Sequence, residues 1–191
     1  MEKVAEANFP SKFGNFKIYG FKAKSGKEYV VLGKNVEDDS IIPIVRIHSQ
    51  CLTGDALGSL RCDCGEQLQE TLKLIEENGR GLLIYQPEEG RGIGILNKLK
   101  AYELQDRGLD TVDANEELGF KADLRSYEEC AQIISHFGFR EIKFISNNPE
   151  KIKAIENMGI KIVERIKLKF EKNEFVKNYL EVKKKKMGHL F

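Results

Sequence analysis

The amino-acid sequence predicts an α/β protein: a single domain with a mixed β-sheet flanked by helices, preceded by an antiparallel, β-rich N-terminal region. Short β-branched and aromatic runs, separated by turn residues, fill the first third of the chain. Beyond them, apolar residues with helical spacing alternate with short strand-like runs. No repeat or Pro/Ser-rich linker divides the 191 residues, so we expect one domain over 1–191.

The N-terminal region contains three predicted strands. Residues 16–21 and 28–32 flank a turn at Ser25-Gly26, and residues 41–47 form a β-branched run. These runs make up the antiparallel, β-rich part of the prediction.

The middle of the chain predicts a helix, a strand and a second helix. Residues 66–77 carry apolar side chains on one helical face, and Asn78-Gly79 marks the end of that helix. The apolar run 82–85 is then a short buried strand, and residues 95–106 form the next helix. An irregular stretch without a predicted element follows.

The remaining elements repeat this alternation. Residues 126–137 predict a helix and residues 142–145 a strand. Asn148 is a helix cap followed by proline at the first helical position, which predicts a helix over 149–157. Residues 160–166 form the last predicted strand.

Composition excludes several classes of protein. The 31 Lys and Arg residues against 30 Asp and Glu residues give a formal charge of +1, which argues against bulk nucleic-acid binding. No apolar run approaches the roughly 18 residues that a membrane span needs. The start of the chain lacks the apolar core of a secretory signal. We therefore expect a cytoplasmic protein that contacts neither membrane nor nucleic acid.

A basic tail, from about residue 171, departs from this balance. Residues 161–191 hold ten Lys and Arg residues and four Glu residues, and Lys183 to Lys186 are consecutive. Such a run is typical of a solvated helix face or tail, and it also suits contact with an anionic surface or nucleic acid. No platform of interleaved aromatic residues accompanies the lysine run 183–186, which favours the solvated tail.

The cysteines fall into two groups. Cys130 lies in an apolar helical run, where a cysteine packs as a small apolar side chain. Cys51, Cys62 and Cys64 have polar neighbours, and such a cluster in a reducing compartment indicates a metal or catalytic site. Three thiolates without an adjacent fourth ligand fit a catalytic zinc with an open position for water. His48 is the alternative fourth ligand, and it would make the site closed and structural.

Two segments suit phosphate binding. Residues 89–94 form a glycine-rich connection from a strand to a helix, and Arg91 within it is a bidentate phosphate partner. Residues 146–151 place a hydroxyl and a lysine at a helix N-terminus. Ordinary turn glycines and an ordinary helix cap are the alternative interpretations. Asp123 and Arg125 lie two residues apart, and from composition alone such a pair is most often a surface salt bridge.

Taken together, these segments resemble GTP cyclohydrolase II, the enzyme that opens riboflavin synthesis. The matching segments run from Arg46 to Leu190: Arg46-Ile-His-Ser, Cys51-Leu-Thr-Gly-Asp55, Arg61-Cys-Asp-Cys-Gly65, Glu89-Gly-Arg-Gly-Ile-Gly94, Asn97-Lys98, Ala101-Tyr102, Leu104-Gln-Asp106, Asp110-Thr-Val, Ala114-Asn115, Leu118-Gly-Phe120, Ala122-Asp123, Arg125, Asn147-Asn148-Pro149, Lys151 and Lys186-Met-Gly-His-Leu190.

The resemblance implies a homodimeric enzyme that depends on zinc and magnesium. It implies conversion of GTP to formate, pyrophosphate and 2,5-diamino-6-(5-phosphoribosylamino)pyrimidin-4-one. One zinc ion per subunit would be bound by Cys51, Cys62 and Cys64 with a water molecule, and Mg²⁺ would accompany the triphosphate.

The resemblance also assigns roles to individual residues. Arg125 corresponds to the proposed nucleophile at the α-phosphate, Asp123 to the proton acceptor beside it, and Tyr102 to a tyrosine near the purine. Because arginine is normally protonated and a poor nucleophile, stabilisation of transition-state charge is the rival role for Arg125. The positions that match nucleotide contacts are Arg46, Ile47, His48, Ser49, Gln50, Gln67, Glu89, Gly90, Arg91, Thr111, Ser146 and Lys151.

The chain departs from the family pattern at three places. Gln50 stands where the family usually has Glu, Pro87-Glu88 where it has Arg-Gln, and Ser146 where it has Thr. These departures motivate an alternative: a divergent relative that releases pyrophosphate or acts on another nucleotide without completing formate release. A third hypothesis is a structural zinc module whose basic tail binds nucleic acid, which requires a fourth zinc ligand.

Overall fold

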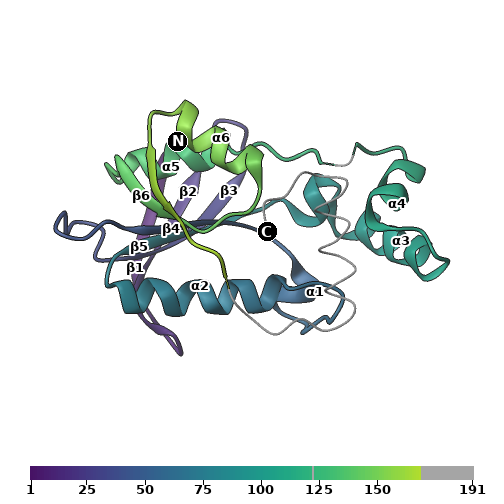
Figure 1. The fold of residues 1–191 in the computed structure, drawn as a ribbon, viewed down its shortest axis with the longest axis horizontal. Helices are drawn as coiled ribbons and strands as arrows, with labels where there is room; N and C mark the ends of the chain where they lie inside the picture. The colour runs from purple at the N-terminus through teal and green to yellow at the C-terminus, as the bar shows by residue number, and fades with distance from the viewer. Residues whose placement is uncertain (122, 169–191) are drawn as a thin grey trace.

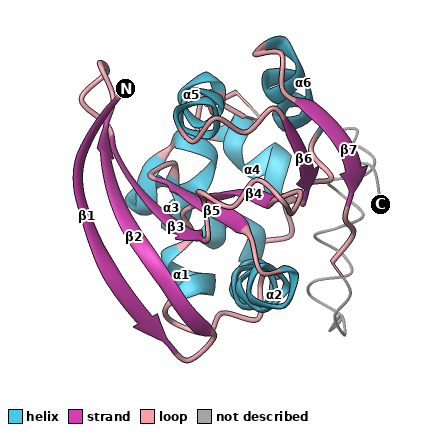
Figure 2. Cartoon of the chain, turned by 90° about the vertical axis from the view of Figure 1, so that its left-hand side faces the viewer, coloured by secondary structure: helices cyan, strands magenta, loops and turns pink. Residues whose placement is uncertain are grey.

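A computed structural model describes residues 1–121 and 123–168, so the basic tail predicted from about residue 171 lies outside the described residues. Within the described part, the chain forms a seven-stranded sheet of order β1-β2-β3-β5-β4-β6-β7 (Figures 1 and 2). The strands are β1 (Glu2–Ser11), β2 (Gly14–Lys22), β3 (Glu28–Lys34), β4 (Ile44–Ser49), β5 (Gly81–Gln86), β6 (Glu141–Phe144) and β7 (Lys161–Arg165).

The sheet is mixed, as predicted. From β1 to β5 in the sheet order, neighbouring strands are antiparallel, whereas β5, β4, β6 and β7 run parallel to one another. The antiparallel part is the N-terminal region, and the parallel part comes from the alternating strands and helices. The predicted α/β class with an antiparallel N-terminal region is therefore confirmed.

Helices cover both faces of this sheet (Figure 2). One face packs against α2, and the other packs against α5 and α6. Helices α3 and α4 lie together at one end of the molecule (Figure 1). The helical elements are α1 (Leu52–Asp55), α2 (Cys64–Asn78), the 3₁₀ helix η1 (Glu89–Gly92), α3 (Gly94–Asp106), α4 (Thr111–Glu117), α5 (Glu128–His136) and α6 (Pro149–Asn157).

Side chains alternate along β4 between the two core clusters. Val45 and Ile47 face the cluster under α5 and α6, whereas Ile44 belongs to the cluster under α2. Full burial of such a side chain stabilises the fold by about 1.5–3 kcal/mol. Cys130 has no exposed surface and lies in the cluster under α5, which confirms its interpretation as a core cysteine. The centre of the sheet is thus anchored on both faces.

Several element boundaries differ from the prediction. The strand predicted from residue 41 begins at Ile44, directly after Pro43, which has no N–H to give to a strand ladder. The helix predicted from residue 126 begins at Glu128, because Tyr127 has a non-helical φ of −121°. Strand β1 and helices α1 and α4 were not predicted.

The predicted start of α6 and the predicted end of α2 are both confirmed by their local geometry. The Asn148 side chain accepts a hydrogen bond from the backbone N–H of Glu150, and Pro149 occupies the first helical position of α6. Helix α2 ends at Gly79, whose φ of 80° is left-handed and suits glycine. Among the described residues, no helix is both long and apolar enough to cross a membrane.

Candidate active site

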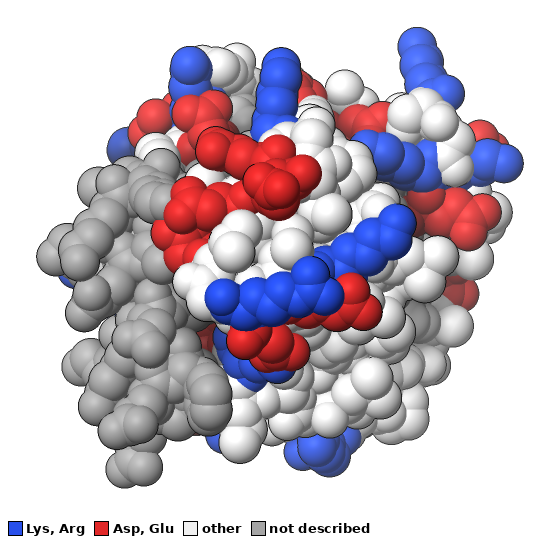
Figure 3. All heavy atoms as spheres, turned by 90° about the vertical axis from the view of Figure 1, so that its right-hand side faces the viewer, with Lys and Arg blue, Asp and Glu red and all other residues white. Residues whose placement is uncertain are grey.

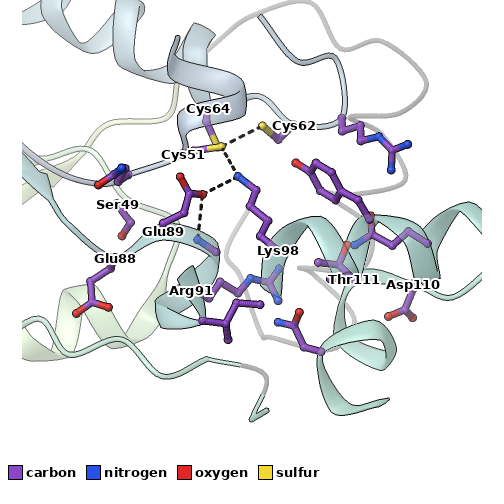
Figure 4. A pocket seen from close by; sticks show the side chains of 18 of the residues that line it. Ser49, Cys51, Cys62, Cys64, Glu88, Glu89, Arg91, Lys98, Asp110 and Thr111 are labelled. Atoms are coloured by element: carbon purple, nitrogen blue, oxygen red, sulfur yellow. Dashed lines mark hydrogen bonds and ion pairs between the residues drawn. The ribbon is translucent and has the colours of Figure 1, made fainter. Parts of the chain in front are cut away.

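A cavity of about 430 Å³ lies beside the carboxyl ends of the parallel strands β4 and β5 (Figure 4). This edge of a parallel sheet is where α/β proteins most often bind ligands. The cavity lies between the β4–α2 connection, the segment after β5, and helices α3 and α4. The predicted site residues that line it are Ser49, Gln50, Cys51, Cys62, Cys64, Glu89, Gly90, Arg91, Tyr102, Thr111 and Arg125.

The three predicted metal ligands meet on one wall of this cavity. The sulfur atoms of Cys51, Cys62 and Cys64 all lie within 4.8 Å of one another, and those of Cys51 and Cys62 are 3.6 Å apart. Hydrogen bonds from Cys62 and Cys64 lower the pKa of the Cys51 thiol, and the charge of Lys98 lowers it further. These sulfurs can hold a metal ion.

The loop that carries Cys51 needs glycine next to the sulfurs. A Cβ atom on Gly54 would lie 2.8 Å from the Cys62 sulfur and 3.2 Å from the Cys51 sulfur. Real Cβ atoms do not approach other atoms so closely, so a side chain here would push the sulfurs apart. The conformation of α1 is thus adapted to the cysteine group.

His48 does not join the cysteines. Its Nε2 atom lies 2.9 Å from Oδ1 of Asp55, and its ring stacks on Tyr85. Burial lowers the pKa of His48, which favours the neutral imidazole. Among the described residues, the metal-binding group comprises the three cysteines without His48. The geometry therefore does not support the closed, four-ligand alternative.

Asp55 links His48 to the backbone of Cys51, at the start of the cysteine loop (residues 51–64). Its Oδ2 atom accepts hydrogen bonds from the Tyr85 hydroxyl at 2.7 Å and from the Cys51 backbone N–H at 3.0 Å. Hydrogen bonding to a buried carboxylate is a strong, charge-assisted interaction. His48 and Tyr85 thus hold the carboxylate that fixes the backbone of the first cysteine.

Lys98 lies in a segment that matches the family pattern, but the sequence assigned it no role in the site. From α3 it reaches the cysteine group, with Nζ 3.1 Å from the Cys51 sulfur and 2.7 Å from Oε1 of Glu89 (Figure 4). It lies one helical turn before Tyr102, so the two side chains share one face of α3. That spacing, next to the predicted Tyr102, was the signal available in the sequence.

Tyr102 projects from α3 beside the cysteine loop. Its hydroxyl is hydrogen-bonded to Oγ1 of Thr53 at 3.2 Å, and the Arg61 guanidinium lies 4.7 Å from the centre of its ring. Burial raises the pKa of Tyr102, so the hydroxyl keeps its proton at neutral pH. Thr111, at the start of α4, lines the same cavity.

The glycine-rich segment after β5 has an unusual backbone. Gly90 and Arg91 both adopt left-handed conformations, with φ of 61° and 64°. For a residue with a side chain this conformation costs of order 1 kcal/mol, and such strain concentrates at functional sites. Arg91 is only 8% exposed and lines the cavity. The segment therefore presents a strained arginine to the cavity.

Asp123 and Arg125 form a bidentate ion pair. The Arg125 Nε and Nη2 atoms donate to the two carboxylate oxygens at 2.9 and 2.6 Å, and Nη1 donates to Oγ of Ser49 at 3.2 Å. Burial opposes ionisation of Asp123, but the hydrogen bonds and charge of Arg125 outweigh it, so the pKa of Asp123 is lowered. The Arg125 side chain is 12% exposed and lines the cavity, unlike an ordinary surface salt bridge.

A second group of predicted site residues lies around β4, all of them buried except Gln67, which is half-buried. Its members, Arg46, Ile47, His48, Gln67, Ser146 and Lys151, do not line the cavity. Arg46 donates to the carbonyl oxygen of Ile145 at 3.3 Å and is hydrogen-bonded to Gln67. Desolvation lowers the pKa of Arg46 to about 10.

Lys151 and Ser146 are also bonded to protein groups. Lys151 Nζ donates to the carbonyl oxygen of Ile47 at 2.8 Å, and Oγ of Ser146 accepts from the backbone N–H of Asn148 at 3.1 Å. Ile47 itself is a core residue without exposed surface. The polar groups of these residues therefore stabilise the junction of β4 and α6.

Two of the departures from the family pattern lie at the cavity. Gln50 lines it, and so does Glu88, whose carboxylate forms an ion pair with Lys27 from the β2–β3 turn. The Glu88 side chain is 8% exposed and that of Lys27 is 41% exposed. A cation from a distant turn thus balances the additional carboxylate.

The comparisons with known proteins agree with the resemblance. The family model described as GTP cyclohydrolase II matches residues 2–167. The chain is 49% identical to GTP cyclohydrolase-2 of Haemophilus influenzae (strain Rd), covering 99% of this chain and 88% of that protein. For GTP cyclohydrolase-2 of Actinobacillus succinogenes, the identity is 50% with the same coverage of both chains.

Longer proteins match as well. Riboflavin biosynthesis protein RibBA of Aquifex aeolicus is 50% identical, over all of this chain and 48% of its own length. A solved structure, the two-domain 3,4-dihydroxy-2-butanone 4-phosphate synthase RibBX of A. baumannii, overlaps 89% of this chain and 40% of its own, with a TM-score of 0.45 and 16% identity. From the family match and the identity to the GTP cyclohydrolase-2 proteins, the chain belongs to the GTP cyclohydrolase II family.

Proposed function

We propose that the protein opens the imidazole ring of GTP and releases formate and pyrophosphate, leaving 2,5-diamino-6-(5-phosphoribosylamino)pyrimidin-4-one for riboflavin synthesis. The observation that carries this proposal is that the three-cysteine group and the Arg125 guanidinium face one cavity. A ring-opening centre and a phosphate-binding cation are the two parts that this reaction needs. Family membership supports GTP as the substrate.

The cysteine group fits zinc. Thiolates are soft ligands that select zinc over magnesium or calcium, and three protein ligands are typical of a catalytic zinc site. Cys51 and Cys62 are each 6% exposed, so the ligands are shielded while the cavity gives access to one side. One zinc ion per subunit would supply Lewis acidity that activates water for attack on the C8 carbon of the purine.

Arg125 and Asp123 are proposed to act at the α-phosphate. The bidentate pair fixes the guanidinium plane and keeps it protonated, which suits stabilisation of charge on a phosphate oxygen. Asp123 stays ionised at neutral pH and is therefore able to accept a proton. We assign Arg125 the electrostatic role, and the covalent role implied by the resemblance is the alternative that is tested below.

The other cavity residues are proposed to bind the nucleotide. Arg91 supplies a second cation for the triphosphate, which Mg²⁺ would accompany. Tyr102, whose hydroxyl is protonated and lies beside Thr53, would donate a hydrogen bond to the purine. The residues around β4 are proposed to support the cavity through their hydrogen bonds to other protein groups. To contact GTP, Arg46 and Lys151 would first have to break their hydrogen bonds to backbone carbonyl oxygens.

The remaining predictions stay proposals with their own support. Leu96 and Leu99 on α3 are 73% and 45% exposed, which supports burial of this helix in a homodimer.

At this end of the molecule the described Lys and Arg side chains are interspersed with Asp and Glu side chains (Figure 3), which favours GTP over nucleic acid as the partner. A single domain over 1–191 and a cytoplasmic location stay predictions.

Separate assays of formate and pyrophosphate test the function. Purified protein with GTP, Mg²⁺ and Zn²⁺ should release the two products in equal amounts. Asp123→Asn should reduce both, whereas Glu103→Gln, which removes an exposed carboxylate on α3, should reduce neither. Pyrophosphate without formate would overturn the proposal in favour of the divergent relative.

A further inference from the structure

All three N–H donors of the Lys98 ammonium group have acceptors, and one of these acceptors is a cysteine sulfur. An ammonium group has three N–H donors, and Nζ of Lys98 has three acceptors: the Cys51 sulfur at 3.1 Å, Oγ1 of Thr53 at 3.1 Å and Oε1 of Glu89 at 2.7 Å. The Lys98 and Glu89 side chains are 12% and 8% exposed. A buried, fully bonded cation therefore lies against one of the three sulfurs.

Glu89 connects this lysine back to the cysteine loop. Its Oε2 atom accepts a hydrogen bond of 2.7 Å from the backbone N–H of Leu52, the residue after Cys51. The path from Cys51 through Lys98 and Glu89 to Leu52 closes a ring of contacts that joins the start of α1, helix α3 and η1. Lys98 is held in place from both sides.

We propose that Lys98 is a positioning residue of the metal site, which holds the Cys51 sulfur and withdraws electron density from it. The inference rests on the proposed zinc-dependent function. A hydrogen-bond donor on a ligating sulfur stabilises its lone pairs, so Cys51 donates less electron density to a bound metal. A metal with three thiolate ligands is a weak Lewis acid unless such a contact reduces the donation.

A purely structural salt bridge is the competing explanation. In that case the Lys98–Glu89 pair would only fasten α3 to the loop, and the contact with sulfur would have no effect on the metal. The two explanations predict different absorption spectra for a metal bound to the cysteines. The sulfur-to-metal charge-transfer absorption depends on the energy of the sulfur lone pairs, whereas a fastening role leaves that energy unchanged.

The experiment compares three variants loaded with Co²⁺ in place of Zn²⁺. Lys98→Met removes the donor and keeps the apolar stem, and Lys98→Arg keeps the charge and N–H donors. Lys100→Met removes an exposed lysine two residues along α3 and serves as the matched control. Absorption spectra give the charge-transfer energy, and competition with a chromophoric chelator gives the Zn²⁺ affinity.

We expect Lys98→Met to shift the charge-transfer band to lower energy, because the sulfur loses its donor. It should also weaken Zn²⁺ binding about 10- to 100-fold, the range for loss of an outer-shell partner, because the negatively charged three-thiolate site loses the cation beside it. Lys98→Arg should recover most of both quantities, and Lys100→Met should match the parent. A band at the parent energy in Lys98→Met, with parent affinity for Zn²⁺, would overturn the inference. If Lys98→Met does not fold, Lys98→Leu, which lacks both the charge and the N–H donors, takes its place with the same expected result.

The same measurements separate this inference from the proposed function. If the parent binds no metal through its cysteines, the proposed function fails and the inference fails with it. If the parent binds metal and releases formate while Lys98→Met keeps the parent spectrum and affinity, only the role of Lys98 is wrong.

Discussion

The predicted nucleotide-contacting residues form two groups that differ in whether they line the cavity. The cavity set lines the space beside the cysteines and comprises Ser49, Gln50, Glu89, Gly90, Arg91 and Thr111. The buried set lies around β4 and comprises Arg46, Ile47, His48, Ser146 and Lys151, together with the half-buried Gln67. The resemblance to one family does not distinguish the two groups, but the structure does.

The difference shows that neighbouring residues of one sequence motif, Arg46-Ile-His-Ser, can belong to different groups: some line the cavity and others do not. Along β4 and its end, Arg46 and His48 are bonded to protein partners, whereas Ser49, three residues after Arg46, meets Arg125 at the cavity. Removal of a buried polar group leaves its partner without a hydrogen bond, which costs folding free energy. Changes in the cavity set should therefore alter catalysis first, and changes in the buried set should alter stability first.

The largest expected effect comes from a cysteine of the cavity. Cys62→Ala removes a metal ligand, and we expect formate release to fall at least about 1,000-fold, because water loses a proton far less readily without zinc. Cys130→Ala is the matched control in the core, and it should lower stability while zinc content stays at the parent value. Metal analysis and the formate assay check both variants, and full zinc content in Cys62→Ala would contradict the site.

A smaller effect is expected from Arg125→Lys. Lysine keeps the charge but loses the bidentate geometry with Asp123, so pyrophosphate release should slow about 100-fold, as for loss of one preorganised donor. The melting temperature should stay at the parent value. A guanylyl adduct trapped on the parent and absent from this variant would show that the covalent role is correct and the electrostatic assignment wrong.

Ser146→Ala tests the buried set. The backbone N–H of Asn148 loses its acceptor, so the free energy of unfolding should fall by about 1–2 kcal/mol, and the melting temperature by about 2–6 °C. Thermal unfolding and steady-state kinetics give the two quantities needed. A larger rise in KM for GTP than that caused by Arg91→Met would break the distinction between the two sets.

The smallest effect is a pH dependence from His48. Because burial lowers its pKa in the folded state, the unfolded chain binds a proton at a higher pH than the folded chain does. Stability is therefore complete above the usual histidine range and falls as the pH drops through that range, with a slope of at most about 1.4 kcal/mol per pH unit. Denaturant unfolding between pH 7.5 and about 5.5 measures this slope.

A matched pair of variants attributes the slope to His48. His48→Asn should flatten the dependence, whereas His136→Asn, which keeps His48, should retain it. An equal slope in the parent and in His48→Asn would show that another group is responsible.

The parts of the fold that the sequence predicts are those with a strong apolar pattern. Helices α2 and α5 and the central strands were predicted because one face or both faces pack into a core cluster. Strand β1 was missed because most of its side chains are exposed, so no alternation marks it. Helix α4 is short, and its main signal is the cap at Asp110, whose carboxylate accepts from the N–H groups of Val112 and Asp113.

The candidate site was predictable where residues lie close in sequence. The spacing of Cys51, Cys62 and Cys64 by itself indicates a metal site, and their sulfurs do lie together in the fold. Lys98 was missed because its role depends on α3 packing against a loop 47 residues earlier in the chain. Contact with Cys51 is a property of tertiary packing, which the spacing of residues does not encode.

The most direct test is the yield of formate per GTP, measured on protein loaded with one zinc ion per chain and on the same protein after a chelator has removed the metal. We expect one formate for each pyrophosphate from the zinc-loaded protein, and no formate after metal removal until zinc is restored. Formate release at the same rate from metal-free protein, or pyrophosphate without formate from zinc-loaded protein, would show that a metal held by the three cysteines does not open the ring of GTP.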